Sequence, residues 1–147
     1  MTGEDHPLTI LVVDDDPADA LIVREVLERQ QIPRNIHYVN GGEQAIDFLL
    51  QRGDYLDAPR PDVVLLDLNM PGVDGREVLA VVKGDVKLRR IPIVVLTTSD
   101  APEDIETSYG LGANAYVTKS INLDDLAASV QRIDEFFART ATLPPAP

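Results

Sequence analysis

The sequence predicts an α/β fold in which five parallel strands form one sheet with helices on both of its faces. Three short apolar runs, at 10–13, 63–66 and 93–96, are typical of strands buried on both faces of a parallel sheet. Weaker runs at 36–39 and 115–117 bring the candidate strands to five, and each interval is long enough for a crossover helix. Right-handed crossovers then favour the strand order 2-1-3-4-5.

The first three helices are predicted from their ends. Pro17 suits the first turn of a helix, and Asp16 before it is expected to cap that helix rather than to bind a metal. A second helix is expected over about 42–51, ending near Gly53, and a third begins near Gly75.

The last two helices follow the fourth and fifth strands. One is expected to follow Asp100, because Glu103 lies at capping-box spacing from it, and to end near Gly110. The other starts after Asn122 and carries apolar residues at helical spacing to about Arg139. The complete alternation predicts a flavodoxin-like (βα)5 three-layer sandwich.

Length and composition limit the class of protein. The 147 residues suit one domain, so we expect a short N-terminal extension at 1–7, the domain at 8–139 and a proline-rich tail at 140–147. A formal charge of −12 argues against direct DNA contact, and the absence of cysteine excludes thiolate catalysis. Since no apolar run is as long as a membrane span and the polar start does not resemble a signal peptide, we expect a cytoplasmic protein without membrane contact.

Polar residues appear where four of the predicted strands end. Asp14 and Asp15 follow the first strand, Asp67 follows the third, Thr97 ends the fourth and Lys119 follows the fifth. Because the carboxyl ends of parallel strands meet at one edge of a sheet, these groups are expected to share a crevice. Clustered carboxylates repel one another, and their oxygen atoms suit a hard cation such as Mg²⁺.

Each of these residues has a simpler interpretation when it is taken alone. An acidic triplet is more often the solvated start of a helix, a single lysine such as Lys119 is usually a surface group, and Tyr116 suits ordinary strand packing equally well. The coincidence of polar groups at four strand ends favours the functional interpretation.

Over roughly 8–139 the chain resembles the receiver domain of two-component response regulators. The resemblance rests on five motifs, in the right order at the strand ends: Val12-Val13-Asp14-Asp15, Leu66-Asp67-Leu68-Asn69-Met70-Pro71-Gly72-Val73-Asp74-Gly75, Val95-Leu96-Thr97-Thr98, Gly112-Ala113-Asn114-Ala115-Tyr116, and Lys119.

The resemblance implies that Asp67 accepts a phosphoryl group from a sensor histidine kinase. Mg²⁺ would be held by Asp15, by the Asp67 carboxylate and by the backbone carbonyl of Asn69, with Asp14 acting through a water molecule. The protein would then be a signalling phosphoacceptor that catalyses only its own phosphorylation and dephosphorylation.

The resemblance also implies a switch. Lys119 and the Thr97 hydroxyl would bind the phosphate, and movement of the threonine would let Tyr116 turn inward. The surface formed by the fourth helix, the fifth strand and the fifth helix would change as a result.

One departure from the usual receiver pattern points to a narrower group. Most receivers have proline after the lysine, whereas this chain has Lys119-Ser120, so the bond is either a strained cis bond or a trans bond with a different path. This step resembles the stand-alone receivers of bacterial phytochrome kinases, as do three later segments: Ile121-Asn122-Leu123, Ile133-Asp134-Glu135-Phe136-Phe137 and Thr140-Ala141-Thr142-Leu143-Pro144. The resemblance implies a light-sensing kinase partner and a homodimer formed through the last helix and tail.

The adjacent residues Phe136 and Phe137 give independent support for such an interface, because they point about 100° apart on a helix. We expect Phe137 to lie in the core, and Phe136 and Leu143 to contribute to a partner surface. Alternatively, Phe136 covers the edge of the fourth helix.

Two other functions compete with the phosphoacceptor. A phosphohydrolase of the haloacid-dehalogenase type also forms an aspartyl phosphate, but it needs a second aspartate where this chain has Asn69, which cannot act as a general acid. A degenerate receiver that only binds a partner usually lacks the acid pair, the acceptor or the lysine, and this chain has all of them. The sequence does not name a downstream protein.

Overall fold

The computed structural model describes residues 7–30 and 33–147 and confirms the predicted alternation of strands and helices. Residues 1–6 of the expected N-terminal extension lie outside the described residues. The strands are β1 (Leu8–Val13), β2 (Arg34–Val39), β3 (Val63–Leu66), β4 (Ile93–Thr97) and β5 (Ala115–Thr118). The helices are α1 (Pro17–Glu28), α2 (Gly42–Leu50), α3 (Gly75–Gly84), α4 (Pro102–Gly110) and α5 (Leu123–Glu135), with a short 3-10 turn η2 (Gly53–Tyr55) and a π-helical turn η3 (Phe136–Thr140).

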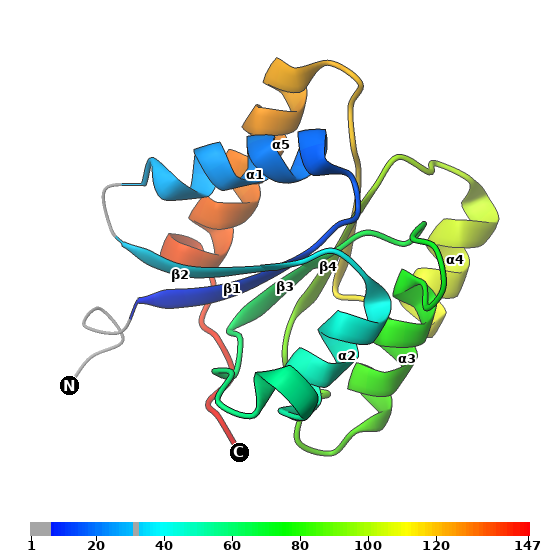
Figure 1. Ribbon diagram of the computed structural model, residues 1–147. Coiled ribbons are helices and arrows are strands. Elements are labelled where there is room, and N and C mark those ends of the chain that lie inside the picture. Colours follow the sequence, from blue (N-terminus) through cyan, green and yellow to red (C-terminus); the bar gives the residue numbers. More distant parts are fainter. Residues whose placement is uncertain (1–6, 31–32) are drawn as a thin grey trace.

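The sheet has the predicted order β2-β1-β3-β4-β5, and all of its strand pairs are parallel. Val13, the last residue of β1, is in register with Val39 on one side and with Leu66 on the other. Helices α1 and α5 cover one face of the sheet, whereas α2 and α3 cover the other, with α4 beside α3 (Figure 1). The ends of β1 and β3 therefore lie together, as a 2-1-3-4-5 order requires.

Two hydrophobic cores lie on opposite faces of the sheet. In β1, Leu11 and Val13 point into the core under α2 and α3, whereas Ile10 and Val12 point into the core under α1 and α5. Every residue of β1, β3 and β4 is buried, which explains why these strands appear as continuous apolar runs rather than as alternating ones.

The helix ends confirm most of the predicted caps. The Asp16 side chain accepts hydrogen bonds from the backbone N–H groups of Ala18 and Asp19. Asn122 caps α5 in the same way, through Asp124 and Asp125. Each side chain satisfies backbone donors that have no partner within the helix.

The expectation that α4 is capped by Asp100 and Glu103 was wrong. The N-cap residue is Ala101, with φ −64° and ψ 129°, and no side chain caps the helix. The reason is Pro102, which occupies the first turn and holds the residue before it in an extended conformation, so that the boundary moves one residue along the chain.

Near the C-terminus, α5 continues into η3, so the chain is helical to about the predicted Arg139. Within the part of the chain that the structure describes, no helix is both long enough and apolar enough to cross a membrane.

A buried ion pair joins β2 to α5. The Arg34 guanidinium donates from Nε to Asp134 Oδ1 at 2.9 Å and from its terminal nitrogen to Asp134 Oδ2 at 3.0 Å. The two side chains are only 2% and 1% exposed. Asp134 follows Leu126 and Val130 at a spacing of four residues, so it lies on the buried face of α5. A charged residue is not expected at such a core position. The two hydrogen bonds between the guanidinium and the carboxylate make this burial tolerable, because each charge is compensated by the other.

Replacing Asp134 with alanine should lower the free energy of unfolding by about 3 to 5 kcal/mol, because Arg34 would lose the buried carboxylate that it pairs with. The matched control is Glu25→Ala, which removes the exposed Arg29–Glu25 pair and should cost about 1 kcal/mol or less. Urea denaturation followed by circular dichroism measures both. Equal losses in the two variants would contradict a special role for the buried pair.

Candidate functional site

Backbone hydrogen bonds between neighbouring strands continue one residue past the ends of β1, β3 and β5. They hold the backbone of three predicted site residues in place. Asp14 N–H donates to the carbonyl of Val39 at 3.1 Å, and Asp67 N–H donates to that of Val13 at 2.9 Å. On the far side, Lys119 N–H donates to the carbonyl of Thr97 at 2.6 Å. Each side chain therefore starts from a rigid point at the carboxyl edge of the sheet.

Three carboxylates converge at this edge. Asp14, Asp15 and Asp67 each place one oxygen atom within 4.8 Å of those of the other two. Asp14 and Asp67 are each only 7% exposed, whereas Asp15 is exposed to solvent. Three oxygen donors with an open side fit a hard divalent cation such as Mg²⁺, which keeps several of its waters. Asn69 lies two residues beyond Asp67 and is exposed, and its part in ligation stays a prediction.

Lys119 lies among these acids. Its Nζ is 2.8 Å from Asp14 Oδ2, 3.4 Å from Asp67 Oδ2 and 3.0 Å from Asp19 Oδ2, and its side chain is only 2% exposed. The sequence analysis missed Asp19, although its place in the first turn of α1, just after the acidic triplet, was an available signal. A single ammonium group thus offsets part of the repulsion among three carboxylates.

Burial and charge shift the ionisation of this cluster. Burial raises the pKa of Asp14 to about 6, although the hydrogen bond from Lys119 and its charge act in the opposite direction. Burial also lowers the pKa of Lys119, but the hydrogen bond to Asp14 and the charges of Asp14 and Asp67 outweigh that effect and raise it above its usual value. Lys119 is therefore a permanent cation at neutral pH.

Thr97 and Tyr116, the two predicted switch residues, lie on β4 and β5. Thr97 is fully buried, and within the described residues its hydroxyl Oγ1 has no hydrogen-bond partner. A buried hydroxyl without a partner is costly and needs an explanation. The Tyr116 hydroxyl donates to the backbone carbonyl of Ser99 at 2.8 Å, so the ring is tied to the loop that follows β4.

A chain of side-chain contacts continues from this loop to α3. Ser99 Oγ donates to Asp104 Oδ2, and Asp104 Oδ1 accepts from the guanidinium of Arg76 in the first turn of α3. These contacts hold the pKa of Asp104 below its usual value, chiefly through the hydrogen bonds from Ser99 and Arg76. The loop after β4 is thus connected to the helix that follows the Asp67 loop.

The loop from 67 to 75 depends on close backbone approach at glycine. A Cβ atom on Gly75 would lie 2.2 Å from the carbonyl oxygen of Asp67, and one on Gly42 would lie 2.1 Å from that of Val73. Gly75 N–H also donates to the Leu68 carbonyl at 2.9 Å. In the sequence, Gly75 marks a helix start and ends one of the receiver motifs, but its role in this close backbone approach was not predicted.

The structure determines the conformation of the peptide bond that follows Lys119. No peptide bond among residues 7–30 and 33–147 is cis, so the bond from Lys119 to Ser120 is trans, one of the two alternatives left open above. Ser120 Oγ accepts a hydrogen bond from the backbone N–H of Asn122 at 3.0 Å, which shapes the turn into α5.

The predicted dimer residues lie away from the acids. Phe136 is 51% exposed, and its ring packs edge-on against Phe137 with 5.1 Å between centroids. Phe137 and Leu143 are partly buried against the core under α1 and α5. Phe136 lines a pocket of about 470 Å³, and none of its lining residues belongs to α4. The other lining residues are Pro92, Val94, Asn114, Ala115, Val117, Arg132, Ile133 and Phe137.

Comparison with known proteins gives consistent matches. The model of the response regulator receiver domain matches residues 10–131. Response regulator Rcp1 of Synechocystis sp. is 49% identical over 147 residues, which cover 99% of this chain and 100% of that relative.

Solved structures agree with the curated relative. The phosphorylated cyanobacterial phytochrome response regulator RcpA superposes with a TM-score of 0.92 and 47% identity, over 95% of this chain and 99% of that one. The Mn²⁺-bound form of response regulator Rcp1 gives a TM-score of 0.91 and 48% identity, over 95% of this chain and 100% of that one.

Replacing Gly75 with alanine should push the Asp67 carbonyl aside and lower the free energy of unfolding by about 1 to 3 kcal/mol. The control is Gly84→Ala at the other end of α3, where no atom lies within 4 Å of the added Cβ, and its effect should stay within about 1 kcal/mol. Urea denaturation and amide NMR shifts of 67–75 report both effects. An unperturbed Asp67 loop in Gly75→Ala would contradict this interpretation.

Proposed function

Since the chain belongs to the response regulator receiver domain family, we propose that it accepts a phosphoryl group on Asp67 from a sensor histidine kinase. The observation that carries the proposal is the placement of Asp67 at the end of β3, beside Asp14, Asp15 and the ammonium of Lys119. A carboxylate is a poor nucleophile, so this reaction needs charge neutralisation around the transferring group rather than an added base.

The acid cluster fits a magnesium ion. Asp14, Asp15, Asp67 and the backbone carbonyl of Asn69 would hold it, and when bound it neutralises charge on the transferring phosphoryl group. The existence of a Mn²⁺-bound form of the relative Rcp1 supports the binding of a divalent cation by this chain.

The chain's own residues carry out the remaining steps. Asp67 attacks in line, so that a bond forms between its carboxylate oxygen and phosphorus while the bond from phosphorus to the kinase histidine breaks. Lys119, already 3.4 Å from Asp67 Oδ2, offers its charge to a phosphate oxygen. The same site promotes the later hydrolysis, so the protein catalyses only its own phosphorylation and dephosphorylation.

The switch would start at Thr97. Its unpartnered hydroxyl donates to a phosphate oxygen once that oxygen is present, and this removes the cost of the buried, unsatisfied group. Movement of Thr97 shifts the loop that carries Ser99, and Tyr116 is hydrogen-bonded to that loop. The surface formed by α4, β5 and α5 then changes shape.

The upstream partner in this proposal is a bacteriophytochrome, a light-sensing histidine kinase. The support is the similarity, at 47% identity, to a structure described as a cyanobacterial phytochrome response regulator. We place the receiver unit at 8–139 with the tail at 140–147, and the reaction in the cytoplasm, where such a kinase presents its phosphohistidine. The signal passes on through protein contact rather than through DNA.

We also propose that the chain forms a homodimer through α5, η3 and the tail. Phe136 is half exposed beside an apolar pocket at β5, which is an edge strand within the described part of the sheet. Leu143 packs against its own core next to this region, so the tail is positioned to extend the surface. An exposed aromatic ring beside an apolar pocket and a free strand edge is typical of an interface.

Incubation with Mg²⁺ and phosphoramidate, followed by intact-mass analysis, tests the phosphoacceptor directly. We expect one phosphoryl group to be added to the native chain and none to Asp67→Asn, whose fold should be unchanged. Addition of a phosphoryl group to the Asn variant would overturn the assignment of Asp67, and no addition to either protein would favour a module that only binds a partner.

Cation binding should weaken as the pH falls. A carboxylate must be deprotonated to bind a metal, and the pKa of Asp14 is raised to about 6, so Mg²⁺ affinity should fall about tenfold between pH 7 and pH 5. Isothermal titration calorimetry measures this change. Asp14→Asn is the control, with weaker binding at pH 7 and a flatter pH dependence, whereas the same pH dependence in both proteins would contradict the role of Asp14.

The raised pKa of Asp14 also has a consequence for stability. Because the folded chain binds this proton more tightly than the unfolded chain does, the contribution of Asp14 to stability falls as the pH rises from about 4 to about 6.

Dimerisation is tested by size-exclusion chromatography with light scattering. A chain that ends at Arg139 and the variant Phe136→Ala should each shift toward the monomer, because each removes apolar contact area. Val86→Ala shortens an apolar side chain that is 71% exposed elsewhere and should leave the mass unchanged. An unchanged dimer in both test proteins would rule out this interface.

A further inference from the structure

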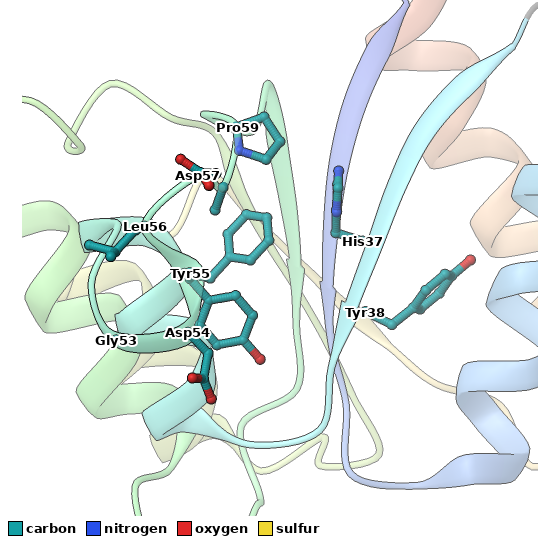
Figure 2. Close-up of a pocket in the computed structure, with 10 residues that line it drawn as sticks. His37, Tyr38, Gly53, Asp54, Tyr55, Leu56, Asp57 and Pro59 are labelled. Carbon is teal, nitrogen blue, oxygen red and sulfur yellow. The ribbon is translucent and has the colours of Figure 1, made fainter.

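A second pocket lies at the β2 edge of the sheet, opposite the β5 edge. It has a volume of about 430 Å³ and lies between β2 and the segment 53–59 that follows α2 (Figure 2). None of the residues that line it belongs to the acid cluster, and the proposed phosphotransfer does not use it.

The segment that forms the outer wall is held in place by its own contacts. Gln51 and Gly53 both have left-handed backbones, with φ of 55° and 63°, and they turn the chain back toward the sheet. Arg52 pairs with Asp47 at 2.7 Å, and Gln51 Nε2 donates to the carbonyl of Ala58 at 2.6 Å. A left-handed backbone at a residue other than glycine is uncommon, and here it closes a pocket that exists before any ligand binds.

Aromatic rings form the inner wall. The rings of His37 and Phe48 lie 5.3 Å apart, and those of Phe48 and Tyr55 lie 5.5 Å apart, each pair tilted by about 55°. His37 points toward this wall, whereas its neighbour Tyr38 points across the sheet toward α1 (Figure 2). Phe48 is buried, whereas the rings of His37 and Tyr55 are only partly buried, and the accessible face of a tyrosine ring attracts a planar cation.

The charges at the mouth have one sign. Asp54 and Asp57 are exposed, and neither makes a hydrogen bond or an ion pair with any residue that the structure describes. No lysine or arginine lines the pocket, and the nearby Asp47 is already paired with Arg52. The two free carboxylates therefore give the aromatic pocket a net negative rim, which is complementary to a cation.

The neighbouring strand provides a place for an extended chain. Within the described part of the sheet, β2 pairs only with β1, so its outer edge can accept the backbone of an added strand. Leu56, beside the mouth, is 70% exposed and offers an apolar contact. A free edge, an apolar contact and a cation pocket lie next to one another.

We propose that this pocket binds an arginine side chain from an extended segment of a partner protein that docks along β2. The guanidinium would stack on the half-buried ring of Tyr55 and pair with Asp54 or Asp57. Arginine suits the site better than lysine, because its planar group stacks on rings and is more weakly hydrated. This surface is separate from the one formed by α4, β5 and α5, so a partner bound here would leave the proposed output surface free.

The test is an NMR titration of the ¹⁵N-labelled full chain with the peptide acetyl-Val-Arg-Val-amide. The amides of 37–38 and 53–58 should shift and saturate with a Kd on the order of 1 mM or tighter. The same peptide with glutamine in place of arginine should bind at least about threefold more weakly, because it carries no cation. Shifts spread over the whole surface, or equal binding of both peptides, would overturn the proposal.

Two double variants that remove the same charge distinguish attraction of the peptide by the pocket from attraction by the net charge of the protein. The double variant Asp54→Asn with Asp57→Asn should weaken binding of the arginine peptide by about threefold to tenfold. Glu103→Gln with Glu106→Gln, on exposed positions of α4, removes the same charge elsewhere and should leave the Kd unchanged. Equal weakening in both double variants would show that only net charge matters, and the pocket would then have no specific role.

Discussion

The structure depends on one electrostatic constraint, the compensation of three carboxylates by the buried ammonium of Lys119. Asp14, Asp19 and Asp67 lie within 2.8 to 3.4 Å of its Nζ, and they come from two strand ends and the first turn of α1. Without a cation, acids this close and this well buried would repel one another. The parallel register of the sheet brings them together, and the lysine makes the arrangement tolerable. A divalent cation held by the carboxylates would add to this compensation.

The same edge of the sheet is joined to the rest of the molecule by specific polar contacts. Tyr116 is hydrogen-bonded to the Ser99 carbonyl, and the Ser99 side chain continues through Asp104 to Arg76 in the helix after the Asp67 loop. A change at Asp67 therefore has two physical routes to α4, one through Thr97 and one through α3. Such contacts matter because packed interfaces change between discrete arrangements rather than deforming smoothly.

Much of the fold could be predicted from local signals. The strand order followed from buried apolar runs and crossover lengths, and Asp16 and Asn122 acted as caps because their side chains satisfy local backbone donors. The Asp100 cap failed because proline geometry outweighed capping-box spacing. The Arg34–Asp134 pair joins positions about one hundred residues apart, and the Gly75 spacing depends on a backbone approach, so neither leaves a pattern that a single sequence reveals.

The proposed function requires that Thr97 and Lys119 bind a phosphoryl group on Asp67. A crystal structure of the chain with Mg²⁺ and beryllofluoride, which mimics an aspartyl phosphate, tests it most directly. We expect beryllium bonded to an Asp67 carboxylate oxygen, with one fluorine within hydrogen-bond distance of Thr97 Oγ1 and another near Lys119 Nζ. Beryllofluoride on another carboxylate, or on Asp67 with Thr97 still unpartnered, would contradict it.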